Sequence, residues 1–244
     1  MNVTKYLVLG FACLLSAVTF AQEPEEQEAR KPGHYNTNRF KQLYEEFSTP
    51  NMYRSPNGAP GPEYYQQQAD YVMDLRLDDK TSRLYGEETI TYTNNSPDVL
   101  EYLWVQLDQN KRARDSQSPL IESEGSTPVM MASSFANSYM GEGFDGGFKI
   151  EWVKDSKGNA LPHTVNRTMM RVEMPKTLKS GEKFTFSIKW WYNVNNHVTD
   201  RARSGYEEFE DGNRAYVIAQ FYPRMAVYSD VEGWQNSQFW GRDE

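Results

Sequence analysis

The sequence predicts an all-β protein, built as an antiparallel, saddle-like sheet or sandwich. From residue 69 onward, apolar segments of strand length recur about every ten residues and are separated by turn-forming residues. Long helical segments do not alternate with them, as a parallel βαβ fold would require. Aromatic residues make up 14% of the 244-residue chain, which favours a packed core over disorder. We therefore expect residues 69–244 to form one antiparallel β domain.

The chain opens with a segment typical of a secretory signal peptide, residues 1–21. Lys5 supplies the positive charge, Tyr6–Phe20 is apolar but too short to span a bilayer, and Ala21 offers a small residue for cleavage. A buried N-terminal helix is the alternative. A signal peptide predicts export to the periplasm or the extracellular space, with surface association left open, and no transmembrane span after its removal.

Cys13 is the only cysteine, and it falls within the expected signal peptide. A lipoprotein would carry its lipid there, but Gly10-Phe11-Ala12 matches such a signal poorly. After cleavage the protein would contain no cysteine, which excludes disulfides, cysteine-bound zinc and a thiol nucleophile.

Residues 22–68 are expected to connect the signal to the β domain. A polar leader comes first, and residues 38–47 then place their apolar side chains on one face of a short helix. Four prolines and two glycines between residues 50 and 63 predict a wrapped loop or extended arm.

Three strands are expected first in the β domain, at residues 71–78, 84–93 and 100–107. In the first, Tyr71, Met73, Leu75 and Leu77 alternate with polar residues, and in the second the threonines share a face. Short turns separate the three strands, so we expect them to form an antiparallel meander.

The second half of the domain is less regular. Residues 108–147 are rich in Ser, Gly, Met and charge, so we expect a functional, partly helical or mobile segment. Further strands are expected at 148–153, 164–174, 184–190 and 215–222, with a turn over 175–181 and a polar loop over 193–213. Residues 237–244 look like the start of another strand, so the domain is expected to be incomplete at its C-terminus.

Composition and motifs exclude several functions. The net charge of −8 disfavours nucleic acid and anionic membranes as partners. No His-Glu-x-x-His is present, and His34, His163 and His197 are isolated, so each is interpreted as an ordinary loop residue. A Gly-x-Ser-x-Gly motif is absent as well. We predict no catalytic residue and no metal ligand in this chain.

Two weaker site candidates each have an ordinary explanation. The acidic run Glu207–Asp211 could bind calcium, but it matches no EF-hand and is more simply a solvated loop. Trp190-Trp191-Tyr192 could stack on a sugar. Because adjacent strand residues face opposite sides, one tryptophan is expected in the core and only the other could be exposed.

Gln220 is the strongest candidate for a ligand-binding residue. It is the one amide in the apolar run 215–222, which we expect to be a buried strand with Gln220 on the same face as Ile218 and Tyr222. A buried amide needs a hydrogen-bond partner. A neighbouring loop could supply that partner, or the amide carbonyl could accept the ammonium group of a ligand.

The run Gln220–Asp230, followed by Gly233-Trp234, resembles the end of the N-terminal β domain of M1-family zinc metallopeptidases, the aminopeptidase N type, in their exported bacterial branch. Asp70-Tyr71, Gly86–Pro97 and Leu103–Asn110 agree with that resemblance, which covers roughly residues 60–244. One departure is Tyr228–Val231, where many members have Asp-Glu-Pro; it puts the usual substrate preference in doubt.

The resemblance implies a saddle-shaped β domain that packs over a thermolysin-like catalytic domain. In such enzymes a glutamine at the position of Gln220 helps to hold the free α-amine of the peptide substrate. Zinc is bound by the catalytic domain, through His-Glu-x-x-His and a distant Glu, and none of these residues occurs here.

The expected function is therefore the substrate-capping, N-terminal portion of an exported M1-like zinc aminopeptidase. Its partners would be the N-terminus of a peptide substrate and the missing catalytic domain, and the chain alone should be inactive. A second hypothesis is a self-contained exported β-sandwich module that binds glycan or protein. A third is an inactive M1 relative that acts as a scaffold.

Overall fold

A computed structural model describes residues 50–117, 144–200 and 204–239, all of which belong to one compact unit spanning residues 33–244. The expected signal peptide, polar leader and helix at 38–47 lie outside the described residues, as do Cys13 and His34. Within the described part of the chain, no helix is long and apolar enough to cross a membrane.

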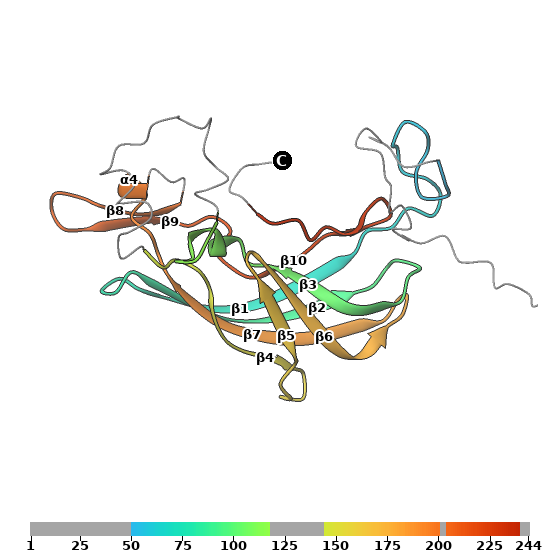
Figure 1. Ribbon diagram of the computed structural model, residues 1–244, viewed down its shortest axis with the longest axis horizontal. Coiled ribbons are helices and arrows are strands. Elements are labelled where there is room, and N and C mark those ends of the chain that lie inside the picture. The colour runs from blue at the N-terminus through green and yellow to red at the C-terminus, as the bar shows by residue number, and fades with distance from the viewer. Residues whose placement is uncertain (1–49, 118–143, 201–203, 240–244) are drawn as a thin grey trace, which may run out of the picture. The chain divides into compact units, whose positions relative to one another are not determined.

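The first sheet contains four antiparallel strands in the order β1-β2-β7-β4 (Figure 1). These strands are β1 (Gln68–Asp78), β2 (Arg83–Thr93), β7 (Lys183–Asn193) and β4 (Lys149–Asp155). β7 carries the alternating pattern that predicted it, and β2 and β7 bury every second residue along most of their length. The predicted threonine face of β2 is confirmed: the Thr89 and Thr91 hydroxyls meet those of Ser187 and Thr185 on β7.

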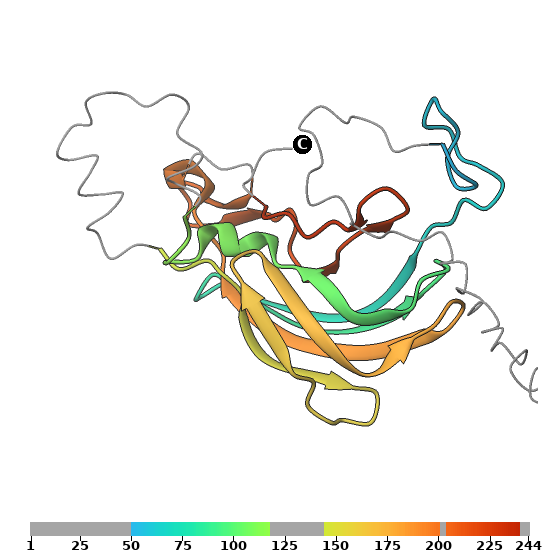
Figure 2. The ribbon, with the colours of Figure 1, turned by 45° about the vertical axis from the view of Figure 1, so that its right-hand side comes forward.

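The second sheet has the order β10-β3-β6-β5 and is also antiparallel. Its strands are β10 (Arg224–Met225), β3 (Leu100–Gln106), β6 (Met169–Leu178) and β5 (His163–Asn166). Figure 2 shows β3, β6 and β5 lying across one face of the longer, curved strands of the first sheet.

The hydrophobic core lies between the two sheets. It is formed by the inward faces of both, with β2, β7 and β4 on one side and β3 and β6 on the other. Trp190 and Tyr192 are both 1% exposed, whereas Trp191 is half-buried on the opposite face, beneath the Arg83 guanidinium. The predictions of an all-β antiparallel sandwich and of one core tryptophan are therefore confirmed.

The predicted meander is wrong, because β2 and β3 belong to different sheets. β2 continues the first sheet by pairing with β7, and β3 pairs with β6 in the second. The chain crosses between the sheets at Asn94, which is fully buried. Its amide donates to the carbonyls of Asp98 and Leu178, and its own backbone pairs with Gly181 and Glu182. A turn anchored in this way directs the chain across the core instead of back along β2.

We expect Asn94→Ala to lower the free energy of unfolding by about 2–4 kcal/mol, because it removes the side-chain hydrogen bonds to the buried Leu178 carbonyl and from the Ser96 N–H. Urea unfolding followed by circular dichroism measures the change. Asn95→Ala is the matched control: Asn95 is exposed and should cost less than about 1 kcal/mol. Equal losses in the two variants would contradict the anchoring role.

Two further strand predictions need correction. The expected strand 164–174 is a hairpin, because Arg167 has a φ of 56° and turns the chain between β5 and β6. The expected turn over 175–181 begins late, since β6 continues to Leu178.

On β1, Leu75 and Leu77 are 42% and 41% exposed despite their apolar alternation. β1 is an edge strand, and its residues from Asp74 to Leu77 are all exposed.

Short elements complete the described structure. The segment after β3 begins with the short 3-10 helix η1 (Asp108–Arg112), in line with the partly helical alternative for residues 108–147, of which 118–143 lie outside the described residues. The expected polar loop 193–213 instead contains a short helix, α4 (His197–Asp200), and one strand of the hairpin β8 (Gly205–Glu208) and β9 (Arg214–Val217). A second hairpin pairs β11 (Tyr228–Ser229) with β12 (Gly233–Trp234). Residues 237–239 form no strand, contrary to the prediction.

Candidate functional site

The segment around Gln220 is a bend and not the buried strand that the apolar run predicts. β9 ends at Val217, and no residue from 215 to 222 is fully buried. Gln220 has a φ of 47°, in the left-handed region that non-glycine residues seldom occupy. The bend cancels the strand alternation, so Gln220 does not share a strand face with Ile218 and Tyr222.

A buried glutamine in the short helix after β3 fixes this bend. Gln109, at 3% exposure, lies in η1 directly after β3. Its Nε2 donates to the carbonyl oxygens of Ala219, at 2.8 Å, and Gln220, at 3.1 Å. Arg112 donates from Nη1 to Gln109 Oε1 at 3.0 Å, which holds the amide in this orientation. Both carbonyls of the bend are thus bound by one side chain.

The opposite side of the bend is held by the loop before β8. The N–H of Ala219 donates to Ser204 Oγ at 3.0 Å. Ser204 is buried, and its carbonyl accepts from Asn195 Nδ2 at 2.7 Å. The backbone before Gln220 is therefore fixed from two directions.

Downstream of Gln220, an ion pair fixes the chain to the start of η1. Arg224 Nε lies 2.8 Å from Asp108 Oδ2, and the Asp108 side chain is 1% exposed. Burial raises the pKa of Asp108, while the hydrogen bond and the charge of Arg224 oppose that rise. Asp108 Oδ1 has no hydrogen-bond partner within the described structure.

An aromatic contact completes the support. The hydroxyl oxygen of Tyr71, on β1, accepts a hydrogen bond from the N–H of Met225 at 2.8 Å. The Tyr71 ring also packs edge-on against the ring of Tyr222, with 5.3 Å between the ring centroids. Burial raises the pKa of Tyr71 to about 12, so the hydroxyl is neutral at physiological pH.

The side chain of Gln220 is half-buried, and no described residue forms a hydrogen bond with its amide. Only its backbone carbonyl is engaged, by Gln109. The site is thus a rigidly held backbone that presents an amide with free hydrogen-bonding capacity. The sequence indicated Gln220 but not Gln109 and Arg112. Their position as polar residues shortly after a buried strand is the signal that could have identified them.

The other candidate residues are occupied by local contacts. His163 opens strand β5 and is therefore not the loop residue that the sequence predicted; its Nδ1 lies 3.1 Å from the Leu161 carbonyl oxygen. His197 begins α4 and lies 3.3 Å from Glu207. In the acidic run, Glu208 pairs with Arg214 at 2.8 Å. Within the described ranges, no group of three or more His, Cys, Asp or Glu residues is placed to hold a metal ion.

Comparison with known proteins gives structural matches only. No protein-family model matches the chain, and no curated protein does. Among solved structures, the chain is similar to the M1 zinc metallopeptidase from Deinococcus radiodurans, with 12% identity, a TM-score of 0.39, and coverage of 68% of this chain and 30% of that one.

Mutant forms of M1 zinc metallopeptidases match in a similar way. One from Deinococcus radiodurans, bound to a Tyr-Ser-Ala substrate, has 11% identity, a TM-score of 0.33, and coverage of 57% of this chain and 23% of that one. A two-domain enzyme bound to L-tryptophan has 12% identity, a TM-score of 0.38, and coverage of 67% and 29%. The chain spans only 23–30% of the length of these structures, so no reaction follows from the similarity.

Proposed function

We propose that the chain is the N-terminal, substrate-capping part of an exported M1-like zinc aminopeptidase, in which Gln220 receives the free α-ammonium of a peptide. The motif that begins at Gln220 and runs through Pro223-Arg224 to Asp230 supports this proposal. Zinc does not fit the described residues, which contain no suitable cluster of ligands. In this proposal the metal and the hydrolytic step belong to the catalytic domain of a longer protein.

The left-handed conformation of Gln220 is the observation that carries the proposal. Holding a non-glycine residue there costs on the order of 1 kcal/mol, and such conformations persist only where the surroundings enforce them. Here Gln109 and Ser204 supply that enforcement. A fixed backbone limits where the amide can point, and in this proposal its carbonyl oxygen accepts a charge-assisted hydrogen bond from an ammonium group.

The gene provides the first test. We expect the reading frame beyond codon 244 to encode His-Glu-x-x-His and a more distant Glu. A continuing frame without that motif would overturn the enzymatic part of the proposal.

In the longer protein, we expect Gln220→Ala to lower kcat/KM for a tripeptide with a free N-terminus by about 10- to 100-fold, the value of one hydrogen bond to a charged group. Steady-state kinetics on purified enzyme measures it. Gln66→Ala is the control, because Gln66 is an exposed amide outside this site and should leave the kinetics unchanged.

Gln109→Ala extends this test. Gln109 does not face the substrate in the proposal, but its loss frees the Gln220 bend and should reproduce part of the kinetic defect. Normal folding together with unchanged kinetics in both Gln220→Ala and Gln109→Ala would reject the assignment of Gln220.

A further inference from the structure

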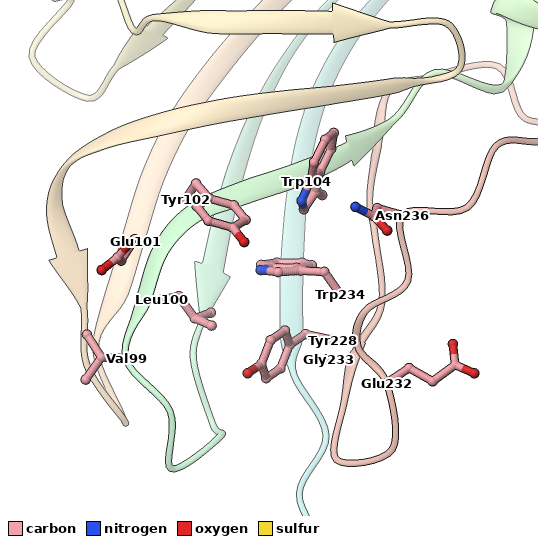
Figure 3. Close-up of a pocket in the computed structure, with 10 residues that line it drawn as sticks. All are labelled: Val99, Leu100, Glu101, Tyr102, Trp104, Tyr228, Glu232, Gly233, Trp234 and Asn236. Atoms are coloured by element: carbon pink, nitrogen blue, oxygen red, sulfur yellow. The ribbon is translucent and has the colours of Figure 1, made fainter. Parts of the chain in front are cut away.

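A second candidate binding site lies on a different part of the fold and does not depend on the proposed function. Strand β3 and the β11–β12 hairpin enclose a hollow of about 360 Å³, within the usual range for small-ligand sites. Four aromatic residues line it: Tyr102 and Trp104 from β3, and Tyr228 and Trp234 from the hairpin (Figure 3).

The aromatic rings that line the hollow lie at steep angles to one another. Tyr102 and Trp104 are related by 88° and Tyr228 and Trp234 by 72°, both edge-to-face. Figure 3 shows Tyr102, Trp104 and Trp234 bordering one common space. Rings at steep angles to one another offer contacts to a compact group from more than one direction. Aromatic faces are electron-rich, so a group surrounded in this way is favoured when it is positive.

The charges around the hollow also favour a cation. Glu101 and Glu232 lie at its rim and are both exposed, with their carboxylates directed away from the aromatic rings in Figure 3, and no Lys, Arg or His is among its lining residues. The guanidinium of Arg171 lies 3.9 Å from the Tyr102 ring centroid, but Arg171 does not line the hollow. It is paired with Glu173 at 2.7 Å, which offsets its charge.

The walls of the hollow are already held in place. The Tyr228 hydroxyl donates to Asp98 Oδ2 at 2.7 Å, and Trp234 also packs against the core residue Tyr92 at 5.9 Å. The backbone of Trp104 accepts the N–H of Ala226 at 2.9 Å. Because little has to be ordered on binding, even a small ligand can bind measurably.

We propose that this hollow binds a compact organic cation of the quaternary-ammonium or guanidinium class, with Tyr102, Trp104 and Trp234 contacting the charged group. Glu101 and Glu232 make the rim of the hollow negative without contacting the ligand. The ligand can be a free small molecule or the end of an arginine side chain, and both sources share the same recognition chemistry.

Isothermal titration of the full chain tests the proposal. Choline should bind at least about tenfold more tightly than 3,3-dimethylbutan-1-ol, its neutral counterpart of equal shape. L-argininamide against L-citrullinamide makes the same comparison for the guanidinium source. Equal binding within both pairs, or binding of cellobiose without binding of either cation, would overturn the proposal.

Matched variants assign binding to the hollow. Trp104→Leu should weaken choline binding about tenfold or more, and Glu232→Gln about two- to fivefold. Trp152→Leu and Glu87→Gln, which alter a half-buried tryptophan and an exposed glutamate outside the hollow, should leave it unchanged. If Trp104→Leu does not fold, Glu101→Gln combined with Glu232→Gln carries the test. Binding insensitive to these changes would place the cation elsewhere.

Discussion

Glu88→Gln is expected to stabilise the protein at pH 7 by about 3 kcal/mol. Glu88 lies on β2, facing the core, and is 1% exposed. Its neighbours across the sheet are Met73 and Ile188, and neither carboxyl oxygen has a hydrogen-bond partner in the described structure. Burial raises the pKa of Glu88 to about 9. The folded protein therefore keeps the carboxyl protonated at pH 7, while the unfolded chain ionises it.

This difference makes the stability of the natural protein depend on pH. Below about pH 4.5 the carboxyl is protonated in both states, and no penalty applies. Between about pH 4.5 and 9 only the unfolded state is ionised, so stability falls by roughly 1.4 kcal/mol for each pH unit gained. Above that range the loss is complete. Glu88→Gln cannot ionise and should lack this part of the slope.

Thermal unfolding at several values between pH 5 and 8 measures the effect. The variant should unfold about 5–10 °C above the natural protein at pH 7, with the difference shrinking toward pH 5. Glu87→Gln is the matched control, since Glu87 is the adjacent exposed residue on the outer face. A constant difference across the pH range, or destabilisation by Glu88→Gln at pH 7, would show that Glu88 is not a neutral core carboxyl.

The strands themselves could be predicted from sequence because alternation is a local signal. β2 and β7 each bury every second residue along most of their length, and both were located. Which strands pair could not be predicted, since pairing depends on contacts between residues far apart in the chain. Asn94 illustrates this: its short turn looks like a hairpin turn, but its bonds to Leu178 and Gly181 turn the chain across the core.

The candidate site could be predicted only in part, because it too depends on contacts between residues far apart in the chain. Gln220 stands out as one amide in an apolar run, so its identity was accessible from the sequence. Its bend was not, because the bend is imposed by Gln109, which is 111 residues away in the chain. The buried Glu88 was also missed: on sequence alone it is one more polar residue within Gly86-Glu-Glu-Thr89.

Gly86→Ala is expected to lower the free energy of unfolding by about 3 kcal/mol, and Gly86→Val by more. Gly86 lies on β2 opposite Trp190 of β7. A methyl group at this position would come within 2.7 Å of three atoms of the Trp190 ring. That ring is 1% exposed, packs edge-on against Phe148 at 5.3 Å and stacks on Tyr192 at 5.8 Å. It has no space into which it can move without displacing other core residues.

A double-mutant cycle isolates this contact from other effects of the methyl group. Combined with Trp190→Phe, which removes part of the obstructing ring, Gly86→Ala should cost far less than it does alone, with a coupling energy of about 1–3 kcal/mol. Gly158→Ala is the control: a methyl there meets no atom within 4 Å, so it should cost only about 1 kcal/mol for its positive φ. Additive losses would mean that the two sheet positions do not touch. Coupled losses would show that the absence of a side chain at Gly86 makes room for the largest buried residue of the core.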